Sequence, residues 1–263
     1  QKEWNSRIER YRQVQRDPLR LKFHLQPPMG WLNDPNGLCQ KDGIYHIYFQ
    51  YCPFYPVQGS IFWGHMTTRD FIRYEEQEPV LYPDSPWDAN GPYSGSAYQE
   101  DGTLYVFYTG NVRYEDGDYD YVNSGREQNT ILTVSRDGFC FSEKRLLMKN
   151  EDYPADLTKH VRDQGRYFMI QGARDRKNRG SILLFESGNL TDWTYRLRFQ
   201  PEKAFGYMWE CPNYLKIEGK RFLIACPQGV PCHGYDFANV YQCGWFSLDY
   251  DFEGTDYKLG TFQ

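Results

Sequence analysis

The sequence lacks both a long apolar run and an excess of basic residues. No stretch of about 18 consecutive apolar residues occurs, which excludes a conventional transmembrane helix. The formal net charge is −5, and the densest basic stretch, residues 174–179, is typical of a solvated loop. We therefore expect neither a membrane nor a nucleic acid as a partner.

The seven cysteines form no recognisable framework. Their odd number and scattered spacing argue against a fold based on disulfide bonds. Cys226, Cys232, His233 and Cys243 do not match the paired spacing of zinc sites, so we expect no metal and reduced thiols. Residues 1–20 are charged and lack the apolar core of a signal peptide. These features favour a cytoplasmic protein.

Aromatic side chains, by contrast, are abundant: they make up 18% of the chain, with 23 Tyr and 7 Trp. Aromatic faces with polar tips suit sugar rings, which present apolar C–H faces and a rim of hydroxyls. Tyrosine-rich segments also form strands readily, so the composition alone does not identify a ligand.

The start of the chain predicts a short helix. Apolar side chains recur at helical spacing from Trp4 to Val14, and Asp17-Pro18 ends the segment, so we expect a helix over residues 3–16. The rest of the chain reads as short strands and turns.

Two motifs then repeat in alternation. The first is a turn glycine before an aromatic-rich strand, at Gly43, Gly102, Gly165 and Gly219. The second is a small polar residue, Asp and an aromatic, within residues 67–74, 134–141, 190–195 and 247–252. Interleaved repeats of this kind predict an all-β fold, a β-propeller with one four-stranded blade per repeat and about four blades here. The alternative is a β-sandwich whose hairpins coincide by chance.

Two further motifs carry candidate acids. The segment from Trp31 to Gly37 reads WLNDPNG. Its last five residues, 33–37, are all turn formers, so a plain turn is one interpretation. The segment from Trp209 to Asn213 reads WECPN. An apolar wall beside Glu210 would raise the pKa of its carboxyl, as a general acid requires, whereas the alternative is a structural Glu paired with an Arg.

Together these motifs resemble glycoside hydrolase family 32, the β-fructofuranosidases that include invertases and bacterial sucrose-6-phosphate hydrolases. WLNDPNG resembles the family's N-terminal signature, and WECPN its acid/base motif. Three intervening segments also match, namely YFQY at 48–51, FWGH at 62–65 and YSGS at 93–96. The resemblance runs from about residue 17 to residue 263 and implies a five-bladed propeller.

The resemblance also implies roles for individual residues. Asp34 would be the nucleophile, Glu210 the acid/base and Asp163 the carboxylate that stabilises the transition state of retaining hydrolysis of terminal β-D-fructofuranosides. The fructose subsite would be lined by Asn33, Gln50, Trp63, Tyr93, Ser94 and Arg162. No metal or organic cofactor is implied. The expected partner is a small fructoside, and the sequence gives no indication of oligomeric state.

The chain departs from the family pattern in two places. After Arg162-Asp163 the expected Pro and a short strand are missing before Gly165, which puts the geometry of the third blade in question. The chain ends where the fourth blade would hand over to a fifth. We therefore expect residues 1–24 to form a helical segment and residues 25–263 an incomplete catalytic propeller, without the C-terminal β-sandwich and poorly active alone.

Several functions stay open at this level. Sucrose, sucrose 6-phosphate and fructans are all compatible substrates, and transfer of fructose is compatible as well as hydrolysis. An inactive or carbohydrate-binding propeller fragment is the alternative from another class. A propeller glycosidase of the arabinanase kind shares the acid trio, but the two acidic motifs argue against it.

Overall fold

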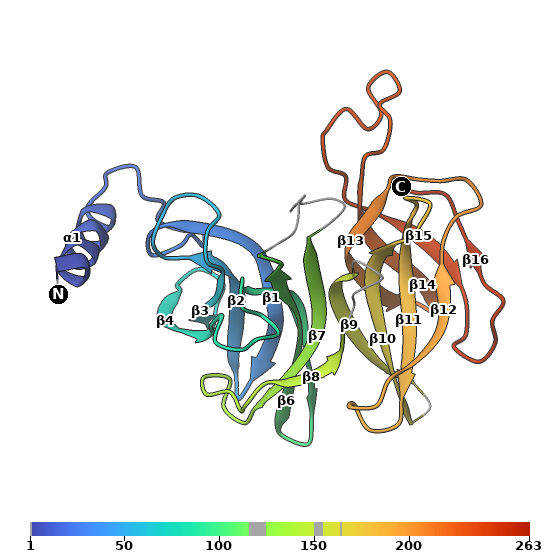
Figure 1. Cartoon of the computed structure of the whole chain (residues 1–263), viewed down its shortest axis with the longest axis horizontal. Helices are drawn as coiled ribbons and strands as arrows, with labels where there is room; N and C mark the ends of the chain where they lie inside the picture. Colours follow the sequence, from blue (N-terminus) through green and yellow to red (C-terminus); the bar gives the residue numbers. More distant parts are fainter. Residues whose placement is uncertain (1, 116–124, 150–154, 164) are drawn as a thin grey trace.

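The computed structural model describes the backbone of residues 2–115, 125–149, 155–163 and 165–263, and the side chains of residues 7–115, 125–149 and 165–263. One helix, α1 (Lys2–Gln15), precedes a series of antiparallel sheets (Figure 1). The predicted helix is thus confirmed to within a residue at each end. Within the described residues, no helix is long and apolar enough to cross a membrane.

The strands form four sheets of four, each in simple meander order. Blade one contains β1 (Trp31–Lys41), β2 (Ile44–Cys52), β3 (Phe62–Thr68) and β4 (Glu75–Leu81). Blade two contains β5 (Pro92–Glu100), β6 (Thr103–Arg113), β7 (Arg126–Ser135) and β8 (Arg145–Met148). Blade three contains β9 (Ala155–Asp163), β10 (Arg166–Arg174), β11 (Gly180–Ser187) and β12 (Thr194–Phe199). Blade four contains β13 (Met208–Ile217), β14 (Lys220–Gln228), β15 (Gly244–Asp249) and β16 (Lys258–Leu259). This arrangement confirms the all-β propeller with four blades.

The repeated glycines close the first hairpin of every blade, as predicted. Lys41 pairs with Ile44 and Glu100 with Thr103, so each turn has two residues. Gly43, Gly102, Gly165 and Gly219 have φ between 73° and 78°. Such two-residue turns need positive φ, which glycine adopts without the steric cost that a Cβ brings.

The second motif builds the connection from the third to the fourth strand of a blade. The Thr68 hydroxyl accepts a hydrogen bond from the Phe71 N–H at 2.9 Å, and Asp70 accepts one from the Arg73 N–H at 2.8 Å. The same pair recurs as Ser135 with Asp137 and as Ser187 with Asn189. In blade three the polar pair therefore lies just before the predicted segment 190–195. These side chains stabilise the turn by satisfying backbone donors that would otherwise lack partners.

Most large aromatic side chains fill the core between neighbouring blades. Trp63 lies between blades one and two, with ring centroids 6.0 Å from Tyr48 and 5.8 Å from Tyr108. Trp209 stacks on Phe246 at 4.7 Å between blades three and four. Burying such rings removes a large apolar area from water and holds adjacent sheets together.

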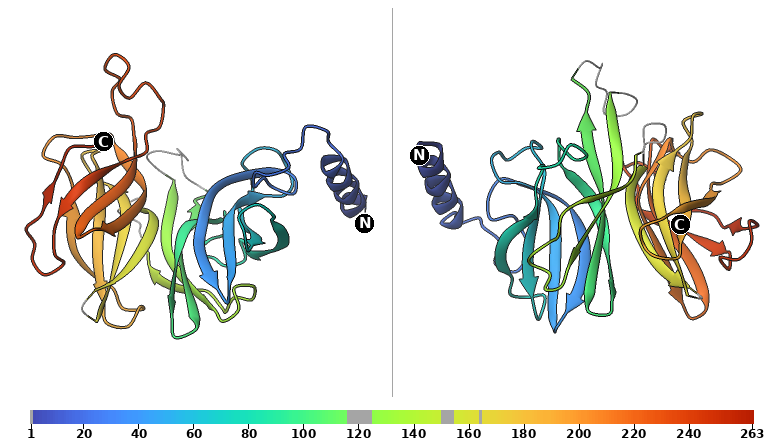
Figure 2. Two further views of the ribbon diagram at one scale, coloured as in Figure 1. Left: turned by 180° about the vertical axis from the view of Figure 1, so that it is seen from behind. Right: turned by 60° about the horizontal axis from the view of Figure 1, so that its bottom comes forward.

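The sheets stand side by side, with α1 beside blade one and the C-terminus at blade four (Figures 1 and 2). The first strands of successive blades are neighbours, β1 with β5, β5 with β9 and β9 with β13. Because each first strand runs before a hairpin of the same type, their starting residues gather at one end of the molecule, which holds the pocket described below.

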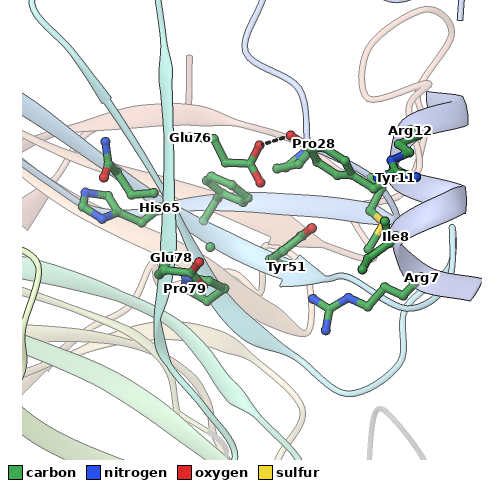
Figure 3. Close-up of a pocket in the computed structure, with 14 residues that line it drawn as sticks. Arg7, Ile8, Tyr11, Arg12, Pro28, Tyr51, His65, Glu76, Glu78 and Pro79 are labelled. Atoms are coloured by element: carbon green, nitrogen blue, oxygen red, sulfur yellow. Dashed lines mark hydrogen bonds between the residues drawn. The ribbon is translucent and has the colours of Figure 1, made fainter. Parts of the chain in front are cut away.

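Helix α1 is attached to blade one by a few polar contacts. The Tyr11 hydroxyl donates to Glu76 of β4 at 3.0 Å, and Gln15 donates to the Pro28 carbonyl at 2.9 Å. Figure 3 shows Tyr11 and Glu76 meeting in a pocket of about 730 Å³ between helix and sheet. The pocket lining mixes Arg7 and Arg12 with Glu76 and Glu78, so it does not favour a ligand of either charge.

Candidate active site

A pocket of about 630 Å³ joins residues from blades one, two and four. It is lined by Asn33, Asp34, Gln50, Gln58, Tyr93, Glu210, Cys211, Cys226, Gln228, Asn239, Tyr241, Gln242 and Cys243. Asp34 lies near the start of β1 and Glu210 near the start of β13, far apart in the sequence. The two acids that the motifs singled out therefore face one cavity.

A β-bulge stands at the pocket end of each first strand. The pairing shifts between Leu32 and Pro35 in β1, which leaves Asn33 and Asp34 outside the regular ladder. In β5 the shift brackets Tyr93 and Ser94, and in β13 it follows Glu210 directly. An extra residue of this kind bends the strand and redirects its side chains. The bulges thus turn these residues toward the pocket.

A chain of hydrogen bonds holds the Asp34 carboxylate. Asn33 donates to the Gln50 side-chain oxygen at 3.0 Å, and Gln50 donates to the Ser94 hydroxyl at 2.9 Å. The Ser94 hydroxyl then donates to Asp34 Oδ2 at 2.7 Å. Gln50 and Ser94 are buried, so these bonds are shielded from water. Three of the predicted subsite residues, Asn33, Gln50 and Ser94, are therefore brought together around Asp34.

The first three residues of the YSGS motif each have a distinct structural role. Tyr93 lines the pocket and Ser94 contacts Asp34. Gly95 donates its N–H to the Asn36 side chain at 3.3 Å, and a Cβ there would lie 2.1 Å from the Phe107 carbonyl oxygen. Only glycine allows β5 to approach β6 so closely. The hydrogen bond from Gly95 to Asn36 connects β5 with β1, the first strands of blades two and one.

Trp63, which was expected in the fructose subsite, and Trp209, which precedes Glu210, both lie in the core. Trp63 is fully buried, does not line the pocket and donates its indole N–H to the Tyr93 carbonyl at 3.0 Å. It lies on β3, two strands away from the first, where blade two covers it. The expected direct contact between Trp63 and substrate is thus not supported. Trp209 likewise points into the core, because successive side chains on a strand face opposite sides, so it forms no wall beside Glu210.

Blade three differs from the sequence expectation. Arg162 and Asp163 belong to β9, whose side chains lie outside the described residues. The register pairs Asp163 with Arg166 beside the two-residue turn, whereas Asp156 pairs with Gly172 at the pocket end next to a bulge. Seven residues of strand separate the two acids by roughly 23 Å. In this register Asp163 stands at the hairpin end of β9, away from the pocket end, and the role expected for its carboxylate stays a prediction.

A second Arg-Asp pair, Arg174-Asp175, contributes Asp175 to the connection between β10 and β11, where it stabilises the loop. Asp175 accepts a hydrogen bond from the Arg179 N–H at 3.0 Å and forms an ion pair with its guanidinium at 2.8 Å. Arg174 is buried, whereas Arg176 and Lys177 are exposed, so the basic stretch is a solvated loop only in part.

On the blade-four side of the pocket, sequence reasoning identified Glu210 but missed Gln228 and the β14–β15 connection. Gln228 accepts a hydrogen bond from the Tyr207 hydroxyl at 2.8 Å, and Asn239, Tyr241 and Gln242 come from the long β14–β15 connection. The β14–β15 connection is irregular, so it has no periodic pattern by which the sequence could predict its position. Gln228, a polar residue directly before Gly229, is the one local feature that could have indicated a binding residue. Among the described residues, no group of three or more His, Cys, Asp or Glu side chains is arranged to hold a metal ion.

Comparison with known proteins gives a consistent picture. The sequence model described as "Glycosyl hydrolases family 32 N-terminal domain" matches residues 24–262. Sucrose-6-phosphate hydrolase from Bacillus subtilis (strain 168) is 40% identical, over 94% of this chain and 52% of its own length.

Two solved structures share the fold. Sucrose-6-phosphate hydrolase from Lactobacillus gasseri is 29% identical, with a TM-score of 0.83 over 92% of this chain and 50% of its own. A variant of a Bombyx mori GH32 β-fructofuranosidase in complex with sucrose is 26% identical, with a TM-score of 0.85 over 100% of this chain and 55% of its own.

The chain spans about half the length of these relatives. Its four blades, the shared pocket of Asp34 and Glu210 and the match over residues 24–262 lead to one conclusion. The chain belongs to glycosyl hydrolase family 32.

Proposed function

We propose that the protein hydrolyses terminal β-D-fructofuranosides such as sucrose or sucrose 6-phosphate, with retention of configuration. The observation that carries this proposal is the common pocket of Asp34 and Glu210, which come from the first strands of blades one and four. The names of the relatives support the substrate class. We assign the activity to residues 25–263 and the helical segment 1–24 to a structural role.

The two acids would divide the reaction between them. Glu210 protonates the leaving glycosidic oxygen while the Asp34 carboxylate attacks the anomeric carbon and forms a fructosyl-enzyme. Glu210 then takes a proton from water, which releases fructose and regenerates Asp34. Retaining enzymes place such carboxyl groups about 5–5.5 Å apart, close enough for direct attack. The Ser94 hydrogen bond orients Asp34 for this step.

The remaining residues supply recognition. Asn33, Gln50 and Tyr93 present polar groups to the pocket, and fructose hydroxyls are their natural partners. By the family pattern, Arg162 and Asp163 would add a guanidinium and a third carboxylate. The register of β9 offers Asp156 at the pocket end as the competing source of that carboxylate. We also propose a cytoplasmic location, since all seven cysteines are thiols and a reducing compartment preserves them.

Incubation with sucrose, and separately with sucrose 6-phosphate, tests the function. Released glucose or glucose 6-phosphate is the expected product, and transfer to added methanol should yield the β-methyl fructofuranoside. An α-linked product would contradict retention. Absence of any hydrolysis, from a folded protein, would favour the carbohydrate-binding alternative.

A further inference from the structure

Two cysteines lie in a row with Glu210 on the wall of the pocket. Glu210 of β13 pairs directly with Cys226 of β14. On the other edge of β14, Ala225 pairs with Gly244, and the Gln242 N–H donates to the Pro227 carbonyl at 3.3 Å. Cys226 and Cys243 lie between these two pairs and therefore face each other across adjacent strands.

The backbone register places this pair at the spacing a disulfide needs. Pro227 and Gln242 form a hydrogen-bonded pair, so the adjacent Cys226–Cys243 pair is of the non-hydrogen-bonded type. Opposite Cα atoms in such pairs are about 4.5 Å apart, with their side chains on the same face. Disulfides span Cα separations of about 4.4–6.8 Å, so the backbone need not move far to form one.

The side chains confirm the close approach. Cys226 and Cys243 both line the pocket, and both are thiols. Cys243 is exposed on the pocket rim, and its partial desolvation raises the pKa of its thiol; the charge and hydrogen bond of Cys226 also raise it. A thiol with a raised pKa reacts slowly at neutral pH, because the thiolate is the reactive form. The two cysteines are therefore slowly reacting thiols rather than highly reactive nucleophiles.

We infer that Cys226 and Cys243 form a thiol–disulfide site: a small disulfide oxidant, of the glutathione disulfide class, converts them into a cross-strand disulfide that slows fructoside hydrolysis. The effect on hydrolysis rests on the function proposed above, whereas formation of the bond does not.

The chemistry balances without any further reactant. One cysteine thiolate attacks the oxidant, forms a mixed disulfide and releases one small thiol. The other cysteine then attacks the protein sulfur, releases the second small thiol and closes the Cys226–Cys243 bond. The protein loses two protons and two electrons, and the oxidant takes them up as it becomes two thiols.

The new bond would act on both sides of the pocket wall. It ties the base of the β14–β15 connection to β14, and this connection supplies Asn239, Tyr241 and Gln242 to the pocket (orange-red loop in Figure 1). The bond also includes Cys226, the cross-strand partner of Glu210, so a shift of Cys226 would displace Glu210. Displacing a catalytic group by about 1 Å can lower turnover on the order of 100-fold, so a modest shift suffices.

The purified protein is equilibrated with glutathione disulfide at a mildly alkaline pH of about 8.5, where more of each thiol is ionised. Peptide mapping by mass spectrometry then identifies the bonds formed. We expect a Cys226–Cys243 disulfide, a loss of two hydrogen atoms in mass, and a several-fold decrease in fructoside turnover that dithiothreitol reverses. Cys226→Ser and Cys243→Ser should each abolish the sensitivity to oxidant, every variant being compared with its own reduced form.

Two exposed cysteines supply the controls. Cys140→Ser, in the β7–β8 connection, should leave the response to oxidant unchanged, and so should Cys232→Ser, in the β14–β15 connection. Mixed disulfides confined to Cys140 or Cys232 would overturn the site. A mapped Cys226–Cys243 bond with unchanged turnover would overturn the effect on hydrolysis. If the reduced protein hydrolyses no fructoside, the proposed function fails, and the peptide map alone decides whether the disulfide site exists.

Discussion

At the scale of single residues, the division of labour between the two acids is the feature most open to test. Asp34 is held by Ser94, whereas Glu210 follows a core tryptophan and stands beside a bulge. Positive φ at Cys211, 49°, is uncommon for a residue with a Cβ and marks a strained position directly after the acid. The bulge and the positive φ at Cys211 thus set the backbone conformation next to Glu210.

Replacing Glu210 separates protonation from nucleophilic attack. Glu210→Gln should lower turnover on sucrose by roughly 10²–10⁴-fold, since general acid catalysis contributes on that order. The loss should be far smaller for a fructoside whose leaving group is already acidic, because such a group departs without a proton. Asp34→Asn should abolish turnover of both substrates. Equal losses for Glu210→Gln on both substrates would remove it from the acid role.

A matched pair of substitutions in β9 locates the third carboxylate. If the active protein keeps the register observed, Asp156→Asn lowers sucrose turnover by at least tenfold and Asp163→Asn leaves it within about twofold. Asp163 lies roughly 23 Å along the strand from Asp156, so the two carboxylates cannot act at the same place. Initial rates of both variants, measured beside the unsubstituted protein, give the comparison. The reverse order of effects would restore Asp163 and show that β9 slides along β10.

At the scale of secondary-structure elements, glycines control how the strands turn and approach one another. Gly102 is required by its φ of 73° alone, because a Cβ there meets nothing within 4 Å. Gly95 is required by space alone, since a Cβ would lie 2.1 Å from a backbone oxygen of the neighbouring strand. Substitution of Gly102 therefore tests backbone conformation alone, and substitution of Gly95 tests steric space alone.

Alanine at each position should give different outcomes. Gly102→Ala should lower the free energy of unfolding by about 1–2 kcal/mol, the cost of the left-handed conformation, and leave sucrose turnover unchanged. Gly95→Ala should destabilise the protein more and also reduce turnover, because it displaces Ser94 and hence Asp34. Urea unfolding and initial rates measure the two effects. Identical behaviour of both variants would contradict the close approach of β5 to β6.

At the scale of the whole molecule, a pair of buried histidines joins blades one and two. His46 and His65 share a hydrogen bond of 3.0 Å between their rings, and both pack against the β7–β8 connection at Phe139. Burial, together with a smaller contribution from the charge of His46, lowers the pKa of His65 from 6.5 to about 3. Burial also lowers the pKa of His46, against the opposing charge of Asp137. Both rings are therefore neutral in the folded protein near neutral pH.

This pair predicts a pH-dependent stability. In the unfolded chain His65 takes up a proton near pH 6.5, whereas in the folded protein it stays neutral down to about pH 3. Stability is therefore complete above pH 6.5 and falls as the pH drops from 6.5 toward 3, by on the order of 1 kcal/mol per pH unit. Denaturant unfolding between pH 7.5 and 5 should show this slope. His65→Gln should flatten it, and substitution of the exposed His24 should not. An unaltered slope in His65→Gln would assign the effect to His46 or to carboxylates.

The repeat and the number of blades were predictable from the sequence alone, and the motifs also singled out Asp34 and Glu210, which line one pocket. Turn glycines such as Gly43 and short-range hydrogen bonds such as those to Asp70 involve only a few consecutive residues, so the sequence pattern alone predicts them. The core position of Trp63 and Trp209 was not predictable in this way, because burial depends on which blade covers a strand. The tertiary structure also decided the register of β9, which one turn and a strand partner impose on Asp163. The meeting of Glu210 with Cys226 and Cys243 is likewise a product of pairing between strands, and no local pattern encodes which residues will face each other across a sheet.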